Sequence, residues 1–111
     1  MPSNLEIKNW KIHARQACTA TKIVAELAKL EGWKLTGDGA DLAIEKTCQF
    51  ANYFETISFV NAVAFIAHRQ DHHPVLTVSY NRCGVRFNTH DVNGISTTDF
   101  ECAAQVDALI A

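Results

Sequence analysis

Histidine is the residue type in this chain best suited to chemistry, and four of its five histidines lie close together in the sequence. These are His68, His72, His73 and His90. The unperturbed pKa of histidine is about 6.5, so an imidazole can donate or accept a proton at neutral pH. A site with several histidines can therefore hold a general acid and a general base together. We interpret the fifth, His13, as a surface residue.

The local sequence around the histidine pair suggests how the imidazoles could be oriented. His68 and His72 are four residues apart and would share one side of a helix. Asp71 precedes the pair and could fix the tautomer of an imidazole. The i, i+4 spacing keeps a metal site open as an alternative, although no H-E-x-x-H motif is present. No serine or cysteine lies in a nucleophile elbow.

The elements that must position these histidines can be predicted from capping residues and apolar periodicity. A first helix begins near Thr19 or Thr21 and stops at Gly32, and a second spans about 53 to 70. Ser96 with Asp99 caps a third. Two hairpins lie between them, from Trp33 to Lys46 and from Val75 to Thr89. The expected fold is α+β, α-β-β-α-β-β-α, a four-stranded antiparallel sheet with three helices packed on one face.

The second hairpin predicts that the histidines converge. Asn81-Arg82 turns the chain between strands 75–80 and 83–89. The end of the last strand then returns beside the start of the third strand. This topology would bring His90 next to His72 and His73.

Composition narrows the class of protein. The 111 residues suit one domain, which we expect at 19–111 after a loosely ordered arm at 1–18. The net charge of -2 gives no electrostatic case for binding nucleic acid or an anionic membrane. We find no signal peptide or membrane span, and four cysteines without a C-x-x-C pair suggest reduced thiols. We therefore expect a cytoplasmic protein.

The motif His68-x-x-x-His72-His73-Pro74, followed by Tyr80, His90 and Asp99, resembles the signature of the pterin-4a-carbinolamine dehydratases. Gly32-Trp33, the apolar pattern of the second helix and Thr89-His90 also match, so the resemblance covers roughly residues 20 to 111. One departure occurs: His68 replaces a glutamate of the family.

The resemblance implies that the protein dehydrates a 4a-hydroxy-tetrahydropterin to quinonoid dihydropterin, without metal or organic cofactor. It maps the catalytic histidines onto His72, His73 and His90. We expect His68, Asp71 and Thr89 to bind the substrate or to support the catalytic histidines. We expect His72 and His90 to transfer protons, His73 to position the ring, and Thr89 to donate to the pterin. The resemblance also implies a homodimer or homotetramer. The alternative is a non-enzymatic dimeric binding module, a coactivator of the same fold.

Overall fold

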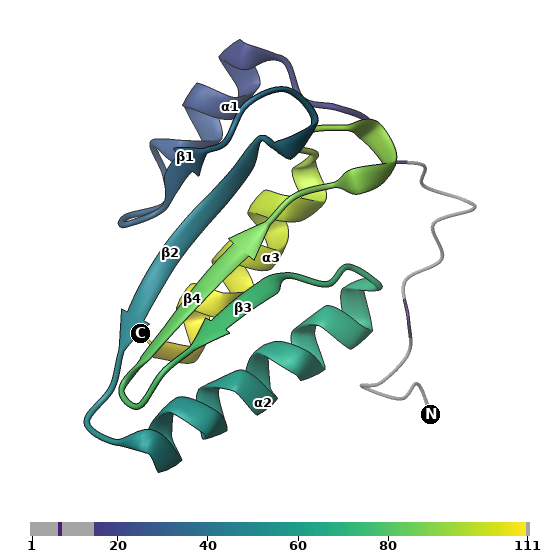
Figure 1. Ribbon diagram of the computed structural model, residues 1–111. Coiled ribbons are helices and arrows are strands. Elements are labelled where there is room, and N and C mark those ends of the chain that lie inside the picture. The colour runs from purple at the N-terminus through teal and green to yellow at the C-terminus, as the bar shows by residue number, and fades with distance from the viewer. Residues whose placement is uncertain (1–6, 8–14, 111) are drawn as a thin grey trace.

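The computed structural model describes Ile7 and residues 15–110, so His13 and most of the predicted N-terminal arm lie outside the described residues. Four strands form one antiparallel sheet in the order β1-β2-β4-β3. Figure 1 shows the arrangement, which confirms the predicted α+β fold. The elements are α1 (Ala20–Leu27), β1 (Lys34–Thr36), β2 (Ala43–Gln49), α2 (Tyr53–Gln70), β3 (Val75–Val78), β4 (Arg82–Phe87) and α3 (Thr97–Ile110), with short 3-10 turns η1 (Gly39–Asp41) and η2 (His90–Val92).

Capping side chains set the starts of the first two helices where the sequence predicts them. The Thr19 side chain accepts a hydrogen bond from the Lys22 backbone N–H, and Asn52 accepts one from Glu55. Helix α2 ends at Gln70 because Asp71 takes a left-handed conformation with φ 48°. That conformation is uncommon for a residue other than glycine, and it turns the chain sharply before His72.

The β3–β4 hairpin turns one residue earlier than the sequence predicts. The Ser79 N–H donates to the Arg82 carbonyl, so Tyr80-Asn81 is the turn and β4 begins at Arg82. The predicted turn at Asn81-Arg82 is therefore wrong by one position. The alternation nevertheless holds in β4, where Cys83, Val85 and Phe87 are all fully buried.

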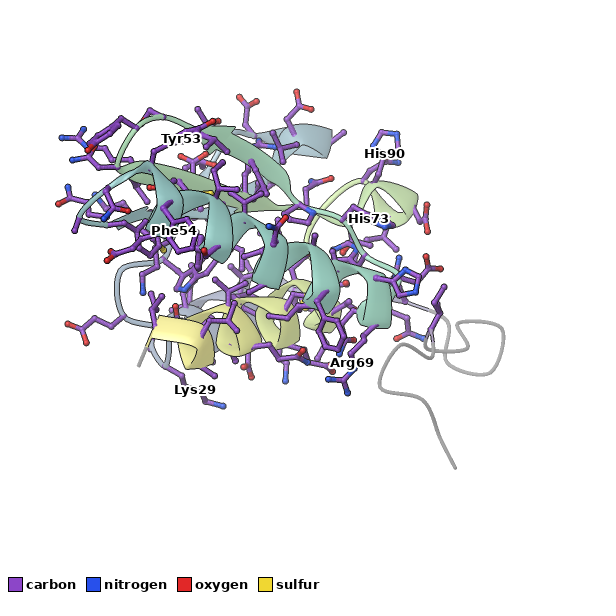
Figure 2. All side chains as sticks on the ribbon, turned by 90° about the horizontal axis from the view of Figure 1, so that it is seen from below. Lys29, Tyr53, Phe54, Arg69, His73 and His90 are labelled. Atoms are coloured by element: carbon purple, nitrogen blue, oxygen red, sulfur yellow. The ribbon has the colours of Figure 1, made fainter. Side chains whose placement is uncertain are left out.

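The core lies between one face of the sheet and the helices, and Figure 2 shows α2 and α3 on the same side of the strands. Its centre combines fully buried side chains of the sheet and of both long helices: Ile44, Val63, Val85, Phe87 and Val106. Each such side chain contributes about 1.5–3 kcal/mol when it leaves water. Within the described residues, no helix is long and apolar enough to cross a membrane.

Residues just before α1 contact the domain next to the histidines. The Cys18 N–H donates to the Ile95 carbonyl at 2.7 Å, and Ala17 forms an isolated antiparallel bridge with Ser96. This part of the predicted arm is therefore hydrogen-bonded to the loop that leads into α3.

Candidate functional site

A buried histidine–carboxylate pair forms the centre of the candidate site. The Nε2 atom of His72 lies 2.5 Å from Oδ1 of Asp99, across 27 positions of sequence. His72 is 6 % exposed and Asp99 is fully buried. A carboxylate in this position holds a proton at Nε2, which leaves the lone pair of a neutral imidazole at Nδ1. The geometry thus selects one tautomer of His72.

The second oxygen of Asp99 is held by the segment that follows β4. Its Oδ2 accepts hydrogen bonds from the Thr89 hydroxyl at 2.6 Å and from the Ser96 backbone N–H at 2.9 Å. The Thr89 and Ser96 hydroxyls also lie 2.6 Å apart. Buried charges require such partners, and here three groups surround one carboxylate. The bond from the Ser96 N–H to the Asp99 carboxylate is one half of the capping interaction predicted at the start of α3. The Asp99 side chain that accepts it also holds His72.

The ring of Phe87 completes the environment of His72. The two rings are stacked with centroids 6.0 Å apart and an interplanar angle of 15°. Phe87 is fully buried at the end of β4. His72 is therefore fixed by a stack on its face and a hydrogen bond at its edge, so its orientation does not depend on a ligand.

His73 and His90 lie at the same end of the molecule and both are exposed. Figure 2 shows both near the end of the molecule at which α2 ends, and in Figure 1 the end of α2 and the η2 turn lie on the same side of the view. The register of β3 with β4 pairs Val75 with Arg86. Continued outward, it places His73 level with Asn88 and His72 level with Thr89, the residue before His90. A turn closed by the Thr89 N–H on the Gly94 carbonyl carries His90.

His68 and Asp71, which precede the His72-His73 pair in the sequence, have surroundings that differ from the sequence-based expectation. Because α2 ends before His72, the helical i, i+4 relation does not apply, and exposed His68 does not share the buried environment of His72. The carboxylate on His72 belongs to Asp99, whereas Asp71 is exposed. Asp71 shapes the site through its backbone conformation.

Thr89 supports the site from within. Its side chain is fully buried and its hydroxyl donates to Asp99. The expected contact of Thr89 with pterin stays a prediction. Sequence reasoning missed the Asp99–His72 contact and the Phe87 stack. The presence of Asp99 in the resembled signature was the signal for the first, and nothing in the local pattern indicated the second.

Among the described residues, two buried cysteines are poor nucleophiles. Burial raises the pKa of the Cys48 and Cys83 thiols, which disfavours the thiolate. All four cysteines are described, and none of them forms a disulfide. In the part of the chain that the structure describes, no group of three or more histidine, cysteine or acidic residues is arranged to hold a metal ion.

Comparison with known proteins gives a consistent family. The model of the family "Pterin 4 alpha carbinolamine dehydratase" matches residues 16–109. A protein of Paracidovorax citrulli, named "Putative pterin-4-alpha-carbinolamine dehydratase", is 68 % identical over 98 % of this chain and 94 % of its own length. A protein of the same name from Bdellovibrio bacteriovorus is 51 % identical over 98 % of this chain and 92 % of its own.

A solved structure supports the same assignment. The crystal structure of a transcriptional coactivator/pterin dehydratase from Brucella melitensis superposes with a TM-score of 0.80 at 27 % identity, covering 86 % of this chain and 99 % of that one. The family match extends over most of the sequence and includes every residue of the histidine–carboxylate pair and its partners. This chain belongs to the pterin-4a-carbinolamine dehydratase family.

Proposed function

We propose that this protein dehydrates 4a-hydroxy-tetrahydropterin to quinonoid dihydropterin by histidine acid–base catalysis, and so recycles the pterin cofactor of aromatic amino acid hydroxylases. The observation that carries the proposal is the orientation of His72 by buried Asp99 at the end of the molecule that also bears His73 and His90. Family membership supplies the reaction, and this geometry supplies groups able to perform it.

The reaction requires two proton transfers. The bond from C4a to the hydroxyl oxygen breaks as that oxygen takes up a proton and leaves as water. The N5 lone pair forms the new C4a–N5 double bond, and the N5 proton passes to a base. We assign these transfers to His72 and His90, and ring positioning mainly to His73. The fixed, buried position of His72 supports its role in proton transfer, and the exposure of His73 and His90 allows both to approach a ligand.

A variant of an exposed histidine tests the proposal without disturbing the core. We expect His90→Gln to lower kcat by about 10²–10⁴-fold, the usual contribution of a general acid or base. The matched control is Arg86→Gln on the open sheet face, which leaves the histidines intact. Dehydration is followed by the absorbance of quinonoid dihydropterin. A wild-type protein that is folded yet inert on the hydroxylated pterin would reject the proposal.

A second copy of this chain is the partner that we propose for the exposed apolar face of α2 and α3. Phe54 is 81 % exposed, and Leu109 and Ile110 are each more than 40 % exposed. Together with Phe50 and Phe59 they line a groove of about 450 Å³. We expect Phe54→Glu to reduce the mass measured by light scattering to that of a smaller species. Val24→Glu, at an exposed apolar position on α1, is the control. An unchanged mass in Phe54→Glu would contradict this interface.

The same face could serve the alternative function, a non-enzymatic binding module. A second observation supports this alternative: the similar protein of Brucella melitensis is named a transcriptional coactivator as well as a pterin dehydratase. The dehydration assay distinguishes the two functions, because a folded protein without dehydratase activity favours the binding role. We also propose that the protein acts in the cytoplasm, supported by four cysteines that form no disulfide.

A further inference from the structure

Arg15 joins the two loops that carry the exposed histidines of the site. Its Nη2 donates to the carbonyl oxygen of Asp71 at 2.6 Å and to that of Gln70 at 3.2 Å. Its Nη1 lies 3.9 Å from Oδ2 of Asp91, the residue after His90. The Arg15 side chain is only 11 % exposed, although it precedes the first helix. One guanidinium thus spans the end of α2 and the η2 turn.

A hydrogen bond to the carbonyl of Asp71 restrains the path that the chain takes toward His72. It belongs to the peptide unit that begins His72, and it follows a residue in the left-handed conformation. The Asp71 N–H is already bonded to the last turn of α2. With the carbonyl bound by Arg15, both sides of this residue are fixed. The direction in which the chain leaves toward His72 and His73 is fixed with them.

Arg15 is itself anchored beside the Asp99 network. Ala17 pairs with Ser96, and the Cys18 N–H donates to the Ile95 carbonyl. Ser96 in turn donates its backbone N–H to Asp99, the partner of His72. The short segment 15–18 therefore contacts the loop before α3, the end of α2 and the η2 turn. These are the three segments that flank the site.

We propose that Arg15 is a positioning residue for the histidine site: its planar guanidinium sets the separation between the His72-His73 loop and the His90 turn. This inference rests on the proposed dehydratase function for its kinetic test, but its structural content is independent of activity. A guanidinium can bind two carbonyls and a carboxylate at once because its donors point in fixed, divergent directions. A lysine ammonium at the same position cannot keep all of these contacts.

The kinetic test compares Arg15→Ala and Arg15→Lys with Arg86→Ala. Arg86 is a matched control, since its Nη2 donates to the Asp41 carbonyl at 2.6 Å and its Nε lies 3.9 Å from Oε2 of Glu45, on segments that carry no histidine. We expect kcat to fall by about 10–100-fold in Arg15→Ala, as a displacement near 1 Å can cost. Arg15→Lys should recover only part of this loss, and Arg86→Ala should keep wild-type kcat. Millimolar guanidinium ion should partly restore Arg15→Ala and leave Arg15→Lys unchanged.

A second readout separates failure of this inference from failure of the proposed function. The ring resonances of His73 and His90 in NMR spectra should shift in both Arg15 variants and stay in place in Arg86→Ala. This result is expected even if the wild-type protein proves inert on hydroxylated pterins. Unshifted resonances in a folded Arg15→Lys would overturn the inference, as would an active wild type whose Arg15→Lys variant keeps full kcat. Arg15→Lys decides the question if Arg15→Ala does not fold.

Discussion

Replacing Asp99 by asparagine changes one oxygen to an NH2 group and should disable His72 without removing it. In the wild-type protein the Asp99 carboxylate accepts at Oδ1 from His72 and at Oδ2 from Thr89 and Ser96. The amide oxygen of asparagine can keep the two contacts of Oδ2. Its NH2 group then faces Nε2 of His72, and two donors cannot share a hydrogen bond. His72 must move its proton to Nδ1, where the lone pair had been.

The expected losses of activity and stability in Asp99→Asn follow from these contacts. The wrong tautomer removes one proton-transfer group, which typically contributes about 10²–10⁴-fold. At 1.36 kcal/mol per decade, this range is about 3–5 kcal/mol of transition-state stabilisation. A hydrogen bond to a charged group contributes about 1.5–3 kcal/mol to folding, so Asp99→Asn should also lose about that much stability. A domain with about 5–15 kcal/mol of stability stays folded after such a loss.

The matched control is Asp107→Asn. The Asp107 carboxylate also has partly buried partners, the Trp33 indole at 3.0 Å and the Lys46 ammonium at 2.9 Å, but no histidine. We expect it to lose stability and keep kcat. Activity is measured from quinonoid dihydropterin formation, stability from urea unfolding, and the tautomer from ¹⁵N chemical shifts of the His72 ring. The reasoning is wrong if Asp99→Asn keeps kcat within about threefold of wild type or if the ¹⁵N shifts still report a proton on Nε2.

Three further expectations concern the scaffold. Burial raises the pKa of the Cys83 thiol above its ordinary 9.0, so the folded state keeps this proton to higher pH than the unfolded chain does. The free energy of unfolding should therefore fall as the pH rises through 9 toward the raised pKa. Cys83→Ala should make this fall smaller in urea titrations at several pH values. Asn52→Ala removes the N-cap of α2 and should cost about 0.5–2 kcal/mol in urea unfolding; no loss would mean that another group caps this end. Gly37→Ala should lower the free energy of unfolding by about 1–3 kcal/mol, because φ is +72° and an added Cβ would lie 2.5 Å from the Asp41 carbonyl oxygen. Gly39→Ala, where φ is +54° and the space is open, should lower it less when both variants are compared by thermal unfolding.

The elements could be predicted because their signals are local. Asn52 before an apolar helical stretch, glycines in the first hairpin turn and alternation along β4 each specify a short segment without reference to the rest of the chain. The predicted position of the second turn is off by one residue because Ser79 to Arg82 contains no glycine to mark it. Tyr80-Asn81 adopts the turn with ordinary backbone angles, so neighbouring residues offered equally good candidates.

The contacts of the site could not be predicted in the same way, since they join distant segments. Asp99 has the sequence signature of a helix cap, and it is one, but only the folded chain brings its second oxygen to His72. The left-handed Asp71 likewise interrupts a spacing that suggested a shared helical face for His68 and His72. A single backbone dihedral at a residue that is not glycine leaves no compositional trace.

The replacement of the family's glutamate by His68 can be explained by where the charged groups lie. The resemblance implies a glutamate there, and His68 removes that carboxylate. However, position 68 is exposed on α2, where the interaction between a charge and its neighbours is screened by water and salt. The carboxylate that contacts an imidazole comes instead from α3 and is fully buried, where a hydrogen bond is stronger than at the surface. Because Asp99 is retained with Thr89 and Ser96 around it, the substitution at 68 leaves the orientation of His72 intact.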